Sequence, residues 1–222
     1  MAVKMEELRR VPLFATLDDD DLAHVAHVTV ERSYDRGDII ILAGQPGGAL
    51  YFVCSGLVKV FKTSEEGKEQ VLRLIGAGHT FNDVPALDAG PNPASAMALE
   101  PTVVYATGGA QLRRLIAERP RVAEATVRTL ASALRHMVTL VEDLSFRHVR
   151  ERVAKILLEQ EERAGTDQHA HRLTQQEMAA MAGTAREMVG RALKDLEAAG
   201  AIHIEHGRIS VLSRERLELM LA

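Results

Sequence analysis

The feature that most restricts the fold is a pair of short motifs near the C-terminal end, each a threonine followed three residues later by a glutamate. Thr174 and Glu177 form the first motif, and Thr184 and Glu187 form the second, directly after Gly183. In such a capping box the threonine hydroxyl accepts a hydrogen bond from the glutamate NH, and the glutamate carboxylate accepts one from the threonine NH. Two boxes at this spacing predict two short helices joined by a tight glycine turn, which is a helix-turn-helix.

The second predicted helix has one apolar and one polar face. Its apolar stripe consists of Val189, Ala192, Leu193 and Leu196. The polar side carries arginines, whose paired NH groups match guanine O6 and N7, and a glutamate, which can accept from cytosine N4. A lysine there suits a phosphate contact. The candidate DNA-binding residues are Thr174, Thr184, Arg186, Glu187, Gly190, Arg191 and Lys194.

The alternative is a solvated face of mixed charge on an ordinary helical hairpin. The residues that follow weaken this alternative, because Ile202–Glu205 and Arg208–Val211 flank His206-Gly207 and predict a two-stranded wing with a tight turn. From His171 to Ala222, seven Lys and Arg balance seven Asp and Glu. Affinity for DNA would therefore depend on where the charges sit, and on a dimer that binds two half-sites.

The first half of the chain predicts an antiparallel sandwich or barrel. Short β-rich runs separated by glycines extend from about Val28 to Thr107. A short helix is predicted ahead of them, over Leu17 to Val28. The single cysteine, Cys54, closes an apolar run and is interpreted as a buried core residue rather than a reactive thiol.

A long helix is predicted to begin at Pro120, where the missing NH of proline is harmless. It carries apolar residues at alternating steps of three and four: Val127, Leu130, Leu134, Met137, Val141 and Leu144. Such a stripe indicates a self-pairing seam, or packing onto the β-rich part of the same chain, with equal weight. A further helix is predicted from about Ser145 to Glu162, followed by a polar loop over Ala164 to His171.

Several functional classes are disfavoured. No apolar run approaches the roughly 18 to 20 residues that span a bilayer, and the N-terminus lacks a secretory signal, so we expect a cytoplasmic protein with no membrane partner. No nucleophile-base pair, metal-ligand spacing or phosphate-binding glycine loop indicates an enzyme. A single cysteine excludes an internal disulfide and an iron-sulfur cluster held by several cysteines.

Over nearly its whole length the chain resembles the CRP/FNR family of transcription regulators. The most specific segments are Thr174–Glu177, Gly183–Arg191 and Asp143–Phe146. The resemblance implies an α+β fold: an N-terminal antiparallel β-roll of the cyclic-nucleotide-binding, cupin-like type over 1–118, a dimerisation helix over 119–145, and a C-terminal winged helix-turn-helix over 146–222. It also implies a homodimer that reads an inverted repeat of TGTGA-like half-sites in double-stranded DNA, with RNA polymerase as a further partner.

The sensing end departs from the cyclic-AMP receptor type. Where the family pattern has Gly-Glu for the ribose and Arg-Ser for the cyclic phosphate, this sequence has Asn82-Asp83 and Ala94-Ser95. A buried phosphate without its arginine is left uncompensated. The positions matching the adenine contacts, Met137 and Val138, offer no hydroxyl. We therefore expect that cyclic AMP is not a tight effector.

The effector itself stays open at this point. A haem-based gas or redox sensor of the same family needs an axial ligand, for which His79 is the first candidate, although a surface or hydrogen-bonded histidine is the favoured interpretation. A ligand-independent regulator with a collapsed pocket is the other alternative. The candidate effector-pocket residues are His79, Phe81, Asn82, Asp83, Asn92, Met137 and Val138.

Overall fold

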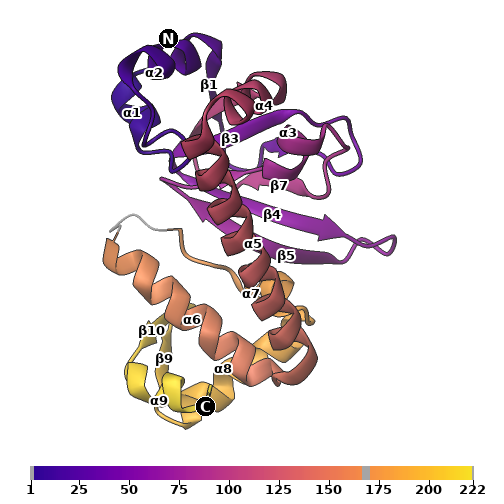
Figure 1. The fold of residues 1–222 in the computed structure, drawn as a ribbon. Helices are drawn as coiled ribbons and strands as arrows, with labels where there is room; N and C mark the ends of the chain where they lie inside the picture. Colours follow the sequence, from indigo (N-terminus) through magenta and orange to yellow (C-terminus); the bar gives the residue numbers. More distant parts are fainter. Residues whose placement is uncertain (1–2, 167–170, 222) are drawn as a thin grey trace. The chain divides into compact units, whose positions relative to one another are not determined.

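The computed structural model describes residues 3–166 and 171–221. Along the chain they form two compact units, Met1–Lys62 with Leu72–Met137, and Thr63–Val71 with Val138–Ala222. Figure 1 shows the β-rich character of the first unit and the helical character of the second. The predicted α+β organisation, with a β-sheet domain, a long helix and a C-terminal helix-turn-helix, is confirmed. None of the helices in the described ranges combines the length and apolar character that crossing a bilayer requires.

The first unit contains two four-stranded sheets. Their orders are β1-β8-β3-β6 and β2-β7-β4-β5. The strands are β1 Thr29–Tyr34, β2 Ile39–Ile41, β3 Ala49–Ser55, β4 Leu57–Thr63, β5 Glu69–Gly76, β6 Thr80–Phe81, β7 Ser95–Ala98 and β8 Thr102–Gly108. Strand β8 pairs antiparallel with both β1 and β3, and β7 pairs antiparallel with both β2 and β4.

Strand β3 is buried on both of its faces, which explains its continuous apolar run. Leu50 and Phe52 pack into the core under the helices, whereas Tyr51 and Val53 pack into the core that includes residues of both sheets. This alternation follows from the two-residue period of a strand. Cys54 is half-buried against the first of these cores, and burial raises the pKa of its thiol to about 12, as expected of a structural cysteine.

Four short helices belong to this unit: α1 Met5–Arg9, α2 Asp19–Val28, α3 Asp83–Asp88 and α4 Gly109–Glu118. Helix α2 confirms the leading helix that the sequence predicts; its N-cap is Asp18, whose carboxylate accepts from the Asp21 NH at 2.9 Å. Residues of α1, α2 and α4 share one apolar core with β3 and β8. That core fixes one face of the roll.

Helix α5, Pro120–Phe146, begins at proline as predicted. The apolar stripe along it is largely uncovered within the chain: Val127, Leu134 and Val141 are 65%, 66% and 63% exposed. Leu130, Met137 and Leu144 are half-buried. Val127 and Leu134, which both belong to the first unit, thus do not pack onto the sheets of that unit.

The second unit holds α6 Val149–Thr166, α7 Gln175–Ala182, α8 Arg186–Ala198, β9 Ile202–Glu205, β10 Arg208–Val211 and α9 Arg214–Leu219. The prediction that a helix starts at Ser145 is wrong, because α5 continues through Phe146. The Arg152 guanidinium donates to the carbonyls of Asp143, Leu144 and Arg147 and so caps the end of α5. The predicted loop from Ala164 is also wrong at its start, since α6 runs to Thr166; residues 167–170 of that loop lie outside the described residues.

Candidate functional site

The first capping box is confirmed. The Thr174 hydroxyl accepts from the Glu177 NH at 3.2 Å, and the Glu177 carboxylate accepts from the Thr174 NH at 2.6 Å. His171 Nε2 lies 3.0 Å from the other Glu177 oxygen. Burial raises the pKa of Glu177, but the hydrogen bonds from His171 and Thr174 outweigh it and lower the pKa to about 2. This carboxylate is therefore ionised throughout the physiological range and fixes the start of α7.

The second capping box is wrong. Helix α8 has Ala185 as its N-cap, and no side chain caps it. Gly183 ends α7 in the left-handed conformation, with φ 60°, and Thr184 follows it in the turn, where its NH donates to the Ala179 carbonyl at 3.0 Å. Because the helix starts one residue later than the motif suggests, the Glu187 carboxylate is not used in capping.

The two faces of α8 are as the sequence predicts. Val189, Ala192, Leu193 and Leu196 are buried against the core of the unit. The other face is exposed to solvent, with Gly190 half-buried at its centre. The exposed members are Arg186, Glu187, Arg191 and Lys194.

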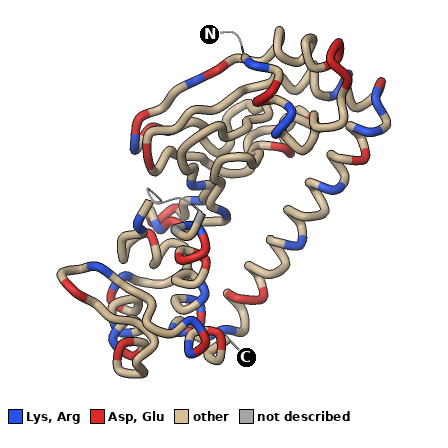
Figure 2. The backbone as a smooth tube through the Cα atoms, turned by 90° about the vertical axis from the view of Figure 1, so that its left-hand side faces the viewer, with Lys and Arg blue, Asp and Glu red and all other residues tan. Residues whose placement is uncertain are grey.

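The four charged side chains on the exposed face of α8 have no partner within the described chain. Within the described part of the chain, Arg186, Glu187, Arg191 and Lys194 make no hydrogen bond or ion pair, whereas Arg214 pairs with Glu162 and Glu218. Figure 2 shows both signs of charge distributed over the C-terminal unit. From Arg186 to Lys194, however, three cations stand against the single carboxylate of Glu187, and the exposed Asp195 follows them. The face therefore carries a local positive charge and hydrogen-bond donors that are free to bind a ligand. Both suit double-stranded DNA, whose phosphates are negative and whose base edges accept hydrogen bonds.

The wing is confirmed as well. Strands β9 and β10 pair antiparallel, and the turn between them has φ 48° at His206 and 77° at Gly207. Two successive left-handed residues are typical of the tight turn that joins two hairpin strands. Helix-turn-helix and wing thus occur in one unit, in the chain order of a winged helix.

A separate cavity of about 250 Å³ lies in the first unit. Four of the predicted effector-pocket residues line it: Phe81, Asn82, Asp83 and Met137. Ala94 and Ser95, which match the phosphate positions of the family, also line it, as do Arg73, Leu72 and Ala133, which the sequence analysis did not single out. Phe81 is held by stacking on Tyr51, with ring centroids 5.0 Å apart. Most of the lining is apolar, from the β5, β6 and β7 strands and from α5.

The other predicted pocket residues lie elsewhere. His79 lines a different groove, described below, and Val138 is 60% exposed. Asn92 lines a neighbouring cavity, where its amide donates to the Leu42 carbonyl at 3.1 Å. His79, Asn92 and Val138 come from three different segments, so which of their side chains face the cavity depends on how distant parts of the chain pack, and not on a local sequence pattern.

Apart from Arg73, the main polar side chains of the cavity already make hydrogen bonds within the described chain. Asn82 adopts the left-handed conformation, φ 64°, and its amide donates to the Ala49 carbonyl at 3.0 Å. The Ser95 hydroxyl accepts from the Ala43 NH at 3.0 Å. Burial raises the pKa of Asp83, which the Thr80 hydroxyl, donating at 3.0 Å, and the positive charge of Arg73 offset only in part.

These residues fit a cyclic phosphate poorly. Arg73 is the one cation among the described lining residues, and Asp83 carries the opposite charge, so an anion would meet no net positive charge. Desolvating a phosphate without a compensating cation is costly. Haem fits no better: a volume of about 250 Å³ lies below the usual range for drug-sized ligands, and the candidate axial ligand His79 is not in the lining.

Comparison with known proteins covers both units. A family model described as a cyclic nucleotide-binding domain matches residues 31–119, and one described as a Crp-like helix-turn-helix domain matches residues 151–220. A CRP-like cAMP-activated global transcriptional regulator from Mycobacterium tuberculosis is 32% identical over 217 residues, covering 96% of this chain and 97% of that protein. The cyclic AMP receptor protein of Thermus thermophilus is 35% identical over 207 residues, covering 93% and 95%.

Among solved structures, FixK2 from Bradyrhizobium japonicum matches with a TM-score of 0.75 and 26% identity, over 88% of this chain and 98% of that one. Relatives that match this chain over nearly its whole length are regulators of transcription, not enzymes.

Proposed function

The chain belongs to the CRP/FNR family of transcription regulators, and from this premise we propose that it acts as a homodimer that reads an inverted repeat of TGTGA-like half-sites in double-stranded DNA. The observation that carries the proposal is the exposed face of α8, on which Arg186, Glu187, Arg191 and Lys194 are free of partners in the described chain. Arg186, Arg191 and Glu187 supply base contacts and Lys194 a phosphate contact. In this proposal Thr174, at the start of α7, and Thr184, in the turn, contact phosphates, and Gly190 allows close approach to the DNA.

The proposed division of labour follows the three segments expected from the sequence: a sensing roll over 1–118, a dimerisation helix over 119–145, and a DNA-binding domain over 146–222. The exposed stripe of α5 supports pairing of two chains, because Val127, Leu134 and Val141 would otherwise leave apolar surface in water. Leu130, Met137 and Leu144 complete the seam. A two-fold dimer presents two reading helices, which matches an inverted repeat.

The test is binding of the full chain to a labelled duplex with two inverted TGTGA half-sites about one helical turn apart, centre to centre. We expect a fluorescence anisotropy change that saturates, at a concentration about a thousandfold below that required for a scrambled duplex. Arg186→Ala should weaken binding to the specific site by about 10- to 100-fold, since a bidentate arginine-guanine pair contributes about 1–3 kcal/mol. Arg36→Ala, an exposed arginine in a turn of the roll, is the matched control and should bind normally. Equal affinity for both duplexes would contradict the proposal.

We propose further that cyclic AMP is not a tight effector of this protein. The support is the neutral, mostly apolar lining of the cavity, with Ala94 and Ser95 where a cyclic phosphate needs an arginine. Adding cyclic AMP should leave the affinity for the specific duplex unchanged. An increase of tenfold or more would contradict this proposal.

A ligand-independent regulator is the second candidate, and the small volume of the cavity favours it. Mass spectrometry of a solvent extract of the purified protein separates the two candidates. A stoichiometric small molecule identifies an effector, whereas an empty extract from protein that binds the specific duplex supports control by abundance.

RNA polymerase is the partner we propose for the DNA-bound dimer, and the cytoplasm is the compartment. Transcription in vitro from a promoter that carries the inverted repeat tests this partnership and shows whether the protein activates or represses transcription. A change in transcript level that is absent with Arg186→Ala supports direct regulation, and unchanged transcription under full occupancy of the site would contradict it.

A further inference from the structure

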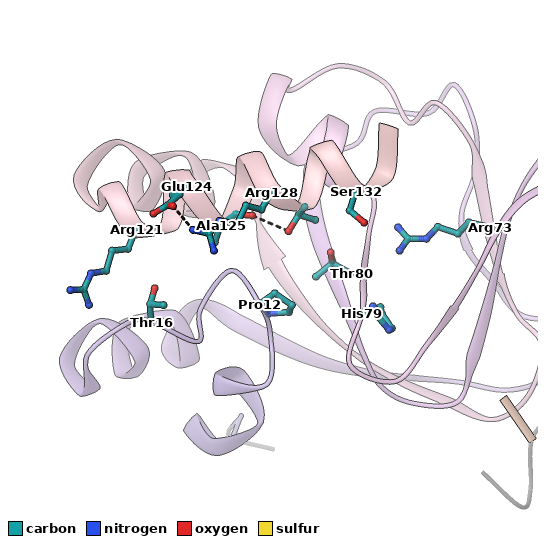
Figure 3. A pocket seen from close by; sticks show the side chains of 11 residues that line it. Pro12, Thr16, Arg73, His79, Thr80, Arg121, Glu124, Ala125, Arg128 and Ser132 are labelled. Atoms are coloured by element: carbon teal, nitrogen blue, oxygen red, sulfur yellow. Dashed lines mark hydrogen bonds and ion pairs between the residues drawn. The ribbon is translucent and has the colours of Figure 1, made fainter. Parts of the chain in front are cut away.

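A groove of about 540 Å³ lies on the first unit, apart from the cavity described above (Figure 3). The N-terminal segment, the β5–β6 region and the first half of α5 all contribute to it. Arg73 and Thr80 line both spaces; the groove is otherwise distinct. Its lining consists of Pro12, Thr16, Arg73, His79, Thr80, Arg121, Glu124, Ala125, Arg128, Thr129 and Ser132.

The lining is strongly basic. Three arginines face one carboxylate, Glu124, which pairs with Arg128. Among the described residues, Arg73 and Arg121 have no ion pair. The carboxylates of the adjoining groove are already engaged, since Asp18 caps α2 and Asp21 pairs with Arg119. Counted over its lining side chains, the groove therefore carries a net charge of about +2 with its histidine neutral; Asp83, whose charge acts on Arg73, lines only the neighbouring cavity.

The donors suit phosphate groups. A guanidinium presents parallel NH groups that match phosphate oxygens. The hydroxyl of Ser132 and the imidazole of His79 lie at the Arg73 end of the groove, and the hydroxyl of Thr16 lies at the Arg121 end (Figure 3). The described lining contains no Phe, Tyr or Trp, so charge and hydrogen bonding would supply most of the affinity.

The cations are spread along the groove. Residues 121 to 132 of α5 line it, and eleven steps of helix rise cover about 16 Å. Arg121 lies at one end, Arg128 between, and Arg73 at the other end (Figure 3). A single phosphate cannot reach cations at both ends. The arrangement therefore favours an extended ligand with at least two phosphate groups.

The groove stays open in the dimer that we propose above, and the inference rests on that proposal only in this respect. At 100° per residue, the α5 residues that line the groove are centred about 150° from the stripe of Val127, Leu134 and Val141. A second chain that covers the stripe leaves the groove accessible to solvent.

We propose that this groove is a second ligand site, which binds a small molecule with a diphosphate or triphosphate chain. Either a nucleoside polyphosphate or inorganic pyrophosphate supplies that chemistry. A bound ligand bridges the N-terminal segment, the roll and α5, and so joins the sensing part of the chain to the first half of the dimerisation helix.

The test is isothermal titration calorimetry of the full chain with pyrophosphate, ATP, AMP and inorganic phosphate at constant ionic strength. We expect pyrophosphate and ATP to bind saturably and at least tenfold more tightly than phosphate or AMP. If pyrophosphate and ATP both bind tightly, the phosphate chain is the part of the ligand that the groove recognises. If only ATP binds tightly, the ligand is a nucleoside polyphosphate. Equal affinity for phosphate and pyrophosphate overturns the proposal.

Substitutions of the arginines in the lining test whether the phosphate ligand binds in this groove. Arg121→Ala and Arg128→Ala should each weaken pyrophosphate binding by about tenfold, because each substitution removes a charged hydrogen-bond donor from the groove. Arg135→Ala, an exposed arginine of α5 outside the groove, is the control and should bind as the parent does. Undiminished binding in both groove variants overturns the proposal. Arg186→Ala keeps the phosphate site while it loses DNA, so a failure of the DNA-binding proposal is recognised separately.

Discussion

Replacement of Gly190 by alanine should stabilise the protein and at the same time weaken its binding to DNA. Glycine inside a helix is about 1 kcal/mol less favourable than alanine. A Cβ built at Gly190 meets nothing closer than Gln175 Oε1 at 3.9 Å, which is ordinary van der Waals contact. Nothing within the described chain therefore requires glycine, and we expect a gain of about 0.5–1 kcal/mol in the free energy of unfolding. For a unit of this size the melting temperature should rise by about 4 °C.

The cost appears when DNA binds. Gly190 lies between Glu187 and Arg191 on the exposed face of α8, so an added methyl occupies the space through which the helix backbone approaches the groove. Inserting a methyl into a packed contact costs about 1–3 kcal/mol. Affinity for the inverted repeat should fall by about tenfold or more.

Differential scanning calorimetry measures the melting temperature of Gly190→Ala, and fluorescence anisotropy with the labelled duplex measures its affinity for DNA. Gly165→Ala provides the control, since Gly165 is also helical and a Cβ there meets nothing within 4 Å. That variant should keep full DNA affinity and gain less stability, because it lies in the last turn of α6. The reasoning is refuted if Gly190→Ala lowers the melting temperature, or binds the repeat as tightly as the parent.

Three further changes have expected outcomes. Thr174→Ala should destabilise the protein by about 1 kcal/mol through loss of the cap of α7, whereas Thr184→Ala, which removes no cap, should change the denaturation midpoint little. Glu177 has a pKa of about 2, below its ordinary value near 4.5, so its contribution to stability is present above pH 4.5 and is lost as the pH falls toward 2. Glu177→Gln should therefore flatten the acid-denaturation profile between these two pH values. An unchanged profile would contradict this assignment. Leu134→Glu should convert dimer to monomer in analytical ultracentrifugation without loss of circular dichroism, since Leu134 is 66% exposed in the single chain; a persistent dimer would exclude the stripe as the seam.

Local patterns predicted the second unit well. The buried stripe of α8 and the wing follow from periodicity and turn residues, which act over a few positions. The second capping box failed because Thr184 lies in the turn after Gly183, where a backbone hydrogen bond to Ala179 shifts the helix start to Arg186. A motif of two residues does not specify which residue caps the helix when the preceding turn already uses its backbone groups.

The roll was predicted less completely. Strands such as β3 appear as apolar runs, because both faces of β3 are buried. Strands β1 and β7 lack such a run: β1 is largely exposed and β7 is short and rich in alanine. The cavity depends on residues far apart in the chain, such as Met137 and Phe81, and the inward or outward direction of each strand residue follows from pairing that no local pattern reveals.

One side chain, Met137, belongs both to the apolar stripe of α5 and to the wall of the cavity. Mutations that retune ligand recognition at this position also alter the surface by which chains select one another. Descendants of a duplicated gene would therefore change their signal and their pairing preference together. Through this coupling, related regulators in one cell would stop forming mixed dimers as their ligands diverge, without separate substitutions at the dimer interface.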